Sequence, residues 1–160
     1  MRKRLNCNGQ SLIEVVISIA LAAILAISLI STTLITQKTS QSAKNNTEAT
    51  KLAQEGVETI RVLRDRQGYD VLLNGDCYTL EYSVPGNIDS LQFYTARCVT
   101  EPKGELIQPN NESSFYRTYK IEDAPSSTDV KLVTVTIKWD ESGGQKEVKH
   151  ETIFSNWESF

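Results

Sequence analysis

An uncharged, apolar stretch near the N-terminus constrains this 160-residue chain more than any other feature. Residues 15–35 contain no charged side chain, and as a helix they are long enough to cross about 30 Å of lipid hydrocarbon. A basic head, Met1-Arg2-Lys3-Arg4, precedes the stretch, and Glu14 stands at its start. Because a carboxylate beside apolar lipid is costly, we interpret Glu14 as a functional residue.

The simplest interpretations of this stretch are a secretory signal peptide and a plain membrane anchor. A secretory signal has a shorter apolar core followed by a small-residue cleavage site, whereas here the small residue Gly9 precedes the core. A lipoprotein signal is disfavoured because Cys7 also precedes the apolar run. A plain anchor accounts for the length of the stretch but not for Glu14.

The hexapeptide Gly9-Gln10-Ser11-Leu12-Ile13-Glu14 resembles the cleavage and methylation signal of type IV prepilins and pseudopilins. The resemblance implies that a prepilin peptidase cuts between Gly9 and Gln10, that Gln10 is then N-methylated, and that Glu14 is the carboxylate used in assembly. The chain departs from the family at one position, because the first mature residue is most often Phe and here it is Gln10.

The same resemblance implies a structural subunit rather than an enzyme: a minor pilin or pseudopilin of a type IV pilus or of a type II secretion-like filament. Its partners would be other pilin or pseudopilin subunits, the prepilin peptidase, the membrane and the inner-membrane assembly platform. The sequence does not separate a pilus from a secretion pseudopilus or a DNA-uptake system. Gly56 and the absence of proline before Pro85 favour a minor subunit.

A second class of function stays open, namely a membrane-anchored extracytoplasmic binding module that never joins a filament. This alternative predicts an intact or signal-cleaved N-terminus and tolerance of Glu14→Ala.

Charge sets the expected topology and argues against one class of partner. The formal net charge is −3, and removal of three positive charges with a leader of residues 1–9 would bring it to −6. Such a chain is a poor candidate for nucleic-acid binding, which usually needs a basic face. The basic head favours a cytoplasmic N-terminus, so the C-terminal part would lie outside the inner membrane and later in an extracellular or periplasmic filament.

Two cysteines would remain after loss of the leader. Cys77 and Cys98 form an even pair in a compartment that permits disulfides, so a bridge between them is expected. Two buried free thiols are the alternative.

The apolar helix is expected to continue well beyond the membrane, from Gln10 to about Arg66, and Gln67-Gly68 is a plausible stop. Helical spacing and charge pairing support this continuation. The apolar stripe consists of Ala49, Leu52, Ala53, Gly56, Val57, Ile60 and Leu63, and the expected ion pairs are Lys51–Glu55, Arg61–Asp65 and Glu48–Lys51. Gly56 lies within the stripe, where the missing side chain would let a sheet approach closely.

After Tyr69 the pattern changes to strands. Alternation and turn signals predict strands at 77–84, 91–99, 115–122, 130–139 and 146–154, with a loop between residues 101 and 114. The expected fold is therefore α+β and pilin-like, a long helix packed on an antiparallel sheet of four to five strands. The expected division is a leader (1–9), a transmembrane helix (10–36), its amphipathic continuation (37–67) and an extracytoplasmic sheet domain (68–160).

No motif for catalysis, for a cofactor or for a metal is evident. The chain lacks a phosphate loop, a dinucleotide glycine fingerprint and zinc-ligand spacing. The single histidine, His150, is predicted to be an ordinary strand residue, because no second histidine or cysteine lies near it in the sequence.

Overall fold

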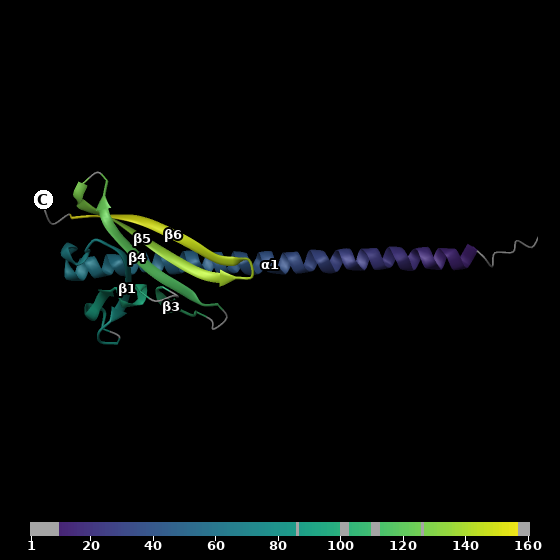
Figure 1. Cartoon of the computed structure of the whole chain (residues 1–160), viewed down its shortest axis with the longest axis horizontal. Helices are drawn as coiled ribbons and strands as arrows, with labels where there is room; N and C mark the ends of the chain where they lie inside the picture. The colour runs from purple at the N-terminus through teal and green to yellow at the C-terminus, as the bar shows by residue number, and fades with distance from the viewer. Residues whose placement is uncertain (1–9, 86, 100–102, 110–112, 126, 157–160) are drawn as a thin grey trace, which may run out of the picture. The chain divides into compact units, whose positions relative to one another are not determined.

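The computed structural model describes residues 10–85, 87–99, 103–109, 113–125 and 127–156. Contacts within the chain divide it into two units, Met1–Ala43 and Lys44–Phe160 (Figure 1). The expected leader of residues 1–9, with Gly9, lies outside the described residues. The expected boundaries after residues 36 and 67 remain predictions.

One long helix, α1 (Gln10–Gln67), begins and ends where the sequence predicts. No proline interrupts it, and Gly68, with a φ of 89°, leaves the helical conformation directly after its last residue. The Gly68 N–H donates to the carbonyl oxygen of Arg64 at 2.8 Å. Arg64 and Arg66 place positive charge in the last turn, where the helix dipole favours it.

Within the second unit, α1 packs against a sheet through its apolar stripe. All seven stripe residues predicted from the sequence are buried, and Ala49, Ala53 and Ile60 are fully enclosed. Gly56 is the point of closest approach. A Cβ added there would lie 3.0 Å from Cγ1 of Val135, which confirms that the missing side chain makes room for the sheet.

The sheet has six strands, all paired antiparallel. In chain order they are β1 (Gly75–Tyr82), β2 (Leu91–Tyr94), β3 (Glu105–Ile107), β4 (Phe115–Ala124), β5 (Ser127–Glu141) and β6 (Gly144–Ser155). Their spatial order is β2-β1-β4-β5-β6, and β3 pairs with β4 beyond the end of β1. The α+β, pilin-like architecture expected from the sequence is therefore confirmed.

The long strands β4, β5 and β6 build the face that covers α1. Alternate residues of β4 and β5 point inward, so Tyr119 pairs with Val135 and Ile121 with Val133 in the core. Phe115 and Trp139 pair in the same way and bring their rings to 5.9 Å between centroids. Among the described strands only β5 pairs with β6, which leaves β6 at the edge of the sheet.

Three details of the sequence prediction were wrong. The predicted loop between residues 101 and 114 contains β3, which is too short to show an alternating pattern, so the sheet has six strands instead of the expected four to five. The second strand ends at Tyr94 instead of residue 99, because a 3₁₀ turn, η3 (Ala96–Cys98), follows it. Of the three expected ion pairs only Glu48–Lys51 forms, at 3.6 Å. Arg61 instead pairs with Glu58, and Glu55 approaches Arg117.

Candidate functional site

The first part of α1 exposes its apolar side chains instead of burying them. Between residues 12 and 35 the large apolar side chains are 53% to 73% exposed. They are Leu12, Ile13, Val15, Val16, Ile17, Ile19, Leu21, Ile24, Leu25, Ile27, Leu29, Ile30, Leu34 and Ile35. By length and composition this helix can cross a membrane, and it is the one such helix in the described part of the chain.

Six hydroxyl side chains between residues 18 and 39 are satisfied within the helix. Each of the six donates to the carbonyl oxygen four residues earlier, at 2.7 to 3.0 Å. These residues are Ser18, Ser31, Thr32, Thr33, Thr36 and Thr39. Because an unpaired hydroxyl is costly in hydrocarbon, this pattern makes a helix with several polar residues compatible with lipid.

Glu14 is the one charged residue of this apolar segment. It is exposed on α1, one turn after Gln10, the first residue of the helix. Ser18 donates to its backbone carbonyl, but within the described residues no side chain pairs with its carboxylate. The nearest basic residue further along the helix is Lys38. Within apolar lipid, such a carboxylate would be costly without a positive partner.

A row of small residues follows Glu14 along the helix. Ser18, Ala22 and Ala26 succeed it at intervals of four, which places them along one side of α1. Small residues at this spacing allow close approach of helices in a membrane. The row and the carboxylate thus share a face of the exposed helix.

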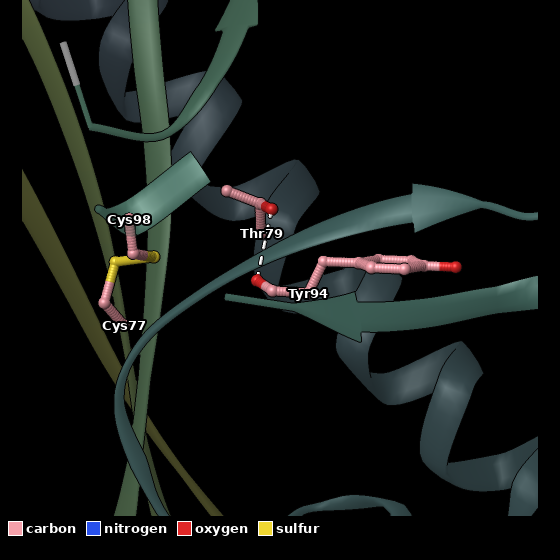
Figure 2. The surroundings of a disulfide bond; sticks show 4 residues. All are labelled: Cys77, Thr79, Tyr94 and Cys98. Atoms are coloured by element: carbon pink, nitrogen blue, oxygen red, sulfur yellow. Dashed lines mark hydrogen bonds between the residues drawn. A yellow bond between two sulfur atoms is a disulfide. The ribbon is translucent and has the colours of Figure 1, made fainter. Parts of the chain in front are cut away.

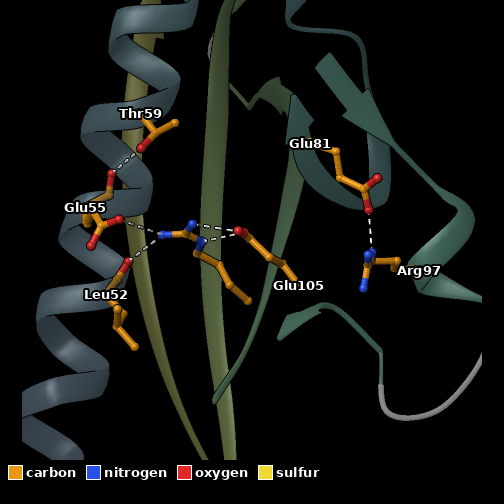
Figure 3. Close-up of polar contacts among 7 residues, drawn as sticks. Leu52, Glu55, Thr59, Glu81, Arg97 and Glu105 are labelled. Carbon is orange, nitrogen blue, oxygen red and sulfur yellow. Dashed lines mark hydrogen bonds and ion pairs between the residues drawn. The ribbon is translucent and has the colours of Figure 1, made fainter. Parts of the chain in front are cut away.

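The second unit holds a buried charge between α1 and the sheet. The Arg117 side chain on β4 is only 7% exposed, and its Nε and Nη2 donate to Oε2 of Glu105 on β3 at 3.1 and 2.9 Å. Its Nη1 donates to the carbonyl oxygen of Leu52 at 3.4 Å and lies 3.7 Å from Oε1 of Glu55. Figure 3 shows Leu52 and Glu55 on α1, across from Glu105. Arg117 thereby connects the helix to two strands.

Tyr119 lies beside this charge. Burial alone would lower the pKa of Arg117, but Tyr119, Glu105 and Glu55 outweigh it, and the pKa is raised. Burial raises the pKa of Tyr119 well above its usual range, against the opposing effect of Arg117. Its hydroxyl is buried without a hydrogen-bond partner among the described residues. Arg117 therefore stays charged and Tyr119 neutral, so the pair is a fixed structural feature.

A second polar contact joins α1 to the sheet just before the first residue of the stripe, Ala49. The Asn45 side chain donates to Oε1 of Glu141 at 3.0 Å and accepts a bond from Ser113 at 3.3 Å. Trp139 Nε1 donates to the same Glu141 oxygen at 2.9 Å. Asn45 is 7% exposed, so its amide is committed to this network.

The disulfide expected from the sequence is present. Cys77 on β1 and Cys98 on η3 are bonded, with 5.9 Å between their Cα atoms (Figure 2). The buried Thr79 hydroxyl donates to the carbonyl oxygen of Tyr94 at 3.3 Å within the same segment. The bridge holds the segment that carries β2 against β1, and the alternative of two free thiols is excluded.

The structure also locates residues for which the sequence predicted no special role. His150 lies half-buried on β6, and with Gln54, Glu58 and Arg61 of α1 it borders an open groove. Across the described residues, no group of three or more His, Cys, Asp and Glu is arranged to hold a metal. The sequence did not reveal the roles of Arg117 and Asn45. For Arg117 the available signal was a charged residue at an apolar position of an alternating strand.

Comparison with known proteins adds one result, and it falls on the exposed helix. Residues 4–30 match the model of the prokaryotic N-terminal methylation motif. No curated protein and no solved structure matches the chain. The matched motif implies processing by a prepilin peptidase and assembly with other pilin subunits, and it points to a structural family that is not enzymatic. Together with the apolar helix, the motif fits a pilin anchored in the inner membrane. The chain thus carries the type IV prepilin-type signature at the start of α1.

Proposed function

We propose that the chain is a structural subunit, a minor pilin or pseudopilin, of a type IV pilus or type II secretion-like filament. One observation carries this proposal: the methylation motif at residues 4–30 matches an exposed apolar helix whose single carboxylate, Glu14, has no side-chain partner among the described residues. A plain membrane anchor needs the apolar helix but has no use for the carboxylate.

In the proposed mechanism, a prepilin peptidase cuts after Gly9 and the new amine of Gln10 becomes methylated. The apolar helix first anchors the subunit in the membrane and later packs with the helices of neighbouring subunits. Glu14 of one subunit pairs with the amine of Gln10 on the next. An ion pair in apolar surroundings adds little net stability, but breaking it costs roughly 3–5 kcal/mol. The pair therefore selects the register of stacking, and the row of Ser18, Ala22 and Ala26 permits close packing.

The first test is the N-terminus of the full chain expressed with a prepilin peptidase. Intact mass and N-terminal sequencing should give a mature chain that starts at Gln10 and carries one methyl group. A Gly9→Leu variant is the matched control and should remain uncut. A wild-type chain that starts at Met1, while a control prepilin is cut under the same conditions, would leave only the anchored binding module.

A second test separates assembly from cleavage. Glu14→Gln removes the charge at nearly constant size, so we expect normal cleavage and loss of the subunit from sheared filaments. Glu14→Asp keeps the charge and should retain part of the assembly. Glu58→Gln makes the same chemical change at an exposed position of the outer domain and should assemble normally. Normal assembly of Glu14→Gln would contradict the proposed role and favour the binding module.

A further inference from the structure

We propose that Gln10 is the site of a second, competing modification, in which the new N-terminal amine is consumed by the residue's own side-chain amide. This inference rests on the proposed cut after Gly9, since only a free amine on Gln10 can react. Methylation would then preserve a charge that cyclisation removes. The mature chain would partition between an N-methylated form that assembles and a cyclised form that does not.

The identity of the residue supplies the chemistry. The neutral α-amino nitrogen attacks the Cδ carbonyl carbon of the carboxamide, and a new N–C bond closes a five-membered ring. The original C–N bond of the carboxamide breaks, and its nitrogen leaves as ammonia with the proton given up by the amine. The product is a neutral lactam, and the step needs no oxidant, reductant or co-reactant.

Loss of this positive charge matters because α1 has no other cation near Glu14. Gln10 is the first residue of α1, and Glu14 lies one turn later without a side-chain partner among the described residues. No basic residue occurs between Gln10 and Lys38. At 1.5 Å per residue, Lys38 is about 36 Å along the helix from Glu14. The amine of residue 10, on the same or a neighbouring copy, is therefore the cation available to this carboxylate in the apolar segment.

The local structure does not oppose cyclisation. A positive charge at the first residue of a helix faces the positive end of the helix dipole, and the neutral lactam removes that conflict. A five-membered ring at the first helical position is as acceptable as the ring of proline, which is favoured there. Cyclisation is instead unfavourable for Glu14, because its carboxylate would be left unpaired in apolar surroundings.

Methylation resolves this conflict in favour of assembly. A methylated amine remains basic and positively charged, so the methylated chain keeps a cation for Glu14. Phenylalanine, the usual first residue of the resembling family, has no carboxamide and cannot cyclise in this way. Assembly of this chain would therefore depend on methylation because residue 10 is a glutamine.

The test uses the full chain in detergent, cut by a prepilin peptidase with or without S-adenosylmethionine as methyl donor. The mass of the N-terminal peptide is followed over days at neutral pH. Without the donor we expect a peptide that starts at residue 10 and is lighter by one ammonia. With the donor we expect a peptide heavier by one methylene, and loss of the lactam. Gln10→Asn is the matched control, since its shorter amide would have to close a strained four-membered ring, and its amine should persist.

A second measurement follows the two forms in cells with limited methylation. The lactam should be enriched in the membrane pool and absent from sheared filaments. A wild-type amine that survives as long as that of Gln10→Asn would overturn the inference while leaving the cut intact. Equal proportions of lactam in the two pools would refute its effect on assembly. A chain that starts at Met1, beside a control prepilin that is cut, would refute both the proposed function and this inference.

Discussion

Arg117 shows what a single residue contributes to this fold. Its guanidinium replaces an apolar side chain on the inner face of β4, and it is held by Glu105 and by the carbonyl oxygen of Leu52. A buried charge is tolerated when its hydrogen bonds are satisfied, and each of these partners comes from a different element. The residue therefore fixes where β3 and α1 sit against β4.

We predict that Arg117→Leu lowers the free energy of unfolding by about 3 kcal/mol, because it leaves Glu105 and the Leu52 carbonyl without their partner. Arg97→Leu is the control. It removes the surface ion pair with Glu81 (Figure 3). Both side chains of that pair are more than a third exposed, so the variant should cost less than about 1 kcal/mol. Urea unfolding of the full chain in detergent, followed by fluorescence of the buried Trp139, measures both. Equal losses in the two variants would contradict the role of Arg117.

Single residues also show where sequence reasoning succeeds and where it ends. The stripe from Ala49 to Leu63 was predictable because helical periodicity is local, and Gly56 stood out as a gap in that stripe. The partners of Arg117 and Asn45 were not predictable. The residues of the Arg117–Leu52 bond are 65 positions apart in the sequence, and those of the Asn45–Glu141 bond are 96 positions apart. No local sequence pattern predicts pairing over such separations.

At the scale of elements, the disulfide-bonded segment between β1 and η3 depends on contacts at both of its sides. Cys77 and Cys98 close it at one side. At the other, Gln67 at the end of α1 donates to the carbonyl oxygen of Leu91 at 2.9 Å. Leu91 itself is 1% exposed. The segment is therefore held on both sides and contributes Leu91 to the core.

Replacing both Cys77 and Cys98 with Ser should destabilise the outer domain by about 3 kcal/mol, since the bridge restricts a long segment in the unfolded chain. The same loss should appear when the wild type is unfolded in urea with a reductant. The reductant should not change the midpoint of the double Ser variant. A wild type that is insensitive to reductant would contradict this prediction.

A polar contact that joins β4, β5 and the residue before β1 predicts a pH effect. Nζ of Lys131 on β5 lies 2.6 Å from Oδ1 of Asp123 on β4, and Asn74, just before β1, donates to Oδ2 at 2.6 Å. The bonds from Lys131 and Asn74 lower the pKa of Asp123. Because the folded pKa lies below the unfolded one, the stabilisation is present above about pH 4 and is lost as the pH falls further.

We therefore expect Asp123→Asn to lower the urea midpoint at neutral pH, and the difference from wild type to shrink as the pH falls below about 4. The same substitution at Asp76, whose side chain is 96% exposed, should have little effect on the midpoint at neutral pH. A difference between wild type and Asp123→Asn that is constant down to about pH 2 would show that the carboxylate charge does not stabilise the fold.

At the scale of the whole molecule, the buried core of the described residues lies in the second unit. The buried apolar residues that the structure describes fall between Ala49 and Phe154, whereas the large apolar side chains between Leu12 and Ile35 are exposed. Sequence reasoning could predict this contrast because an all-round apolar helix and an amphipathic one differ in local pattern. The extra strand β3 was missed because its three residues form a strand only by pairing with β4, which no local pattern reveals.

This distribution predicts that residues 44–160 fold without the apolar segment. The fragment should be soluble without detergent, and its urea midpoint should match that of the outer domain in the full chain, because no core residue is removed. A shorter fragment that begins at residue 54 is the control. It lacks Leu52 and Ala53 and should not give a cooperative transition. A fragment 44–160 that fails to fold would show that the apolar segment is needed for folding.

Because β6 lies at the edge of the sheet, its side chains influence whether copies of this chain aggregate. An open edge strand exposes a row of backbone donors and acceptors that can recruit strands from other molecules into aggregates. The exposed side chains of β6 include Lys146, Glu147, Lys149 and Glu151, and Lys149 lies 3.0 Å from Glu147. Charges in this arrangement deter β-aggregation, since incoming strands in several registers would oppose like charges or bury them. A chain held in a membrane beside other subunits with sheets of their own would need such protection most, because crowding raises the frequency of edge-to-edge encounters.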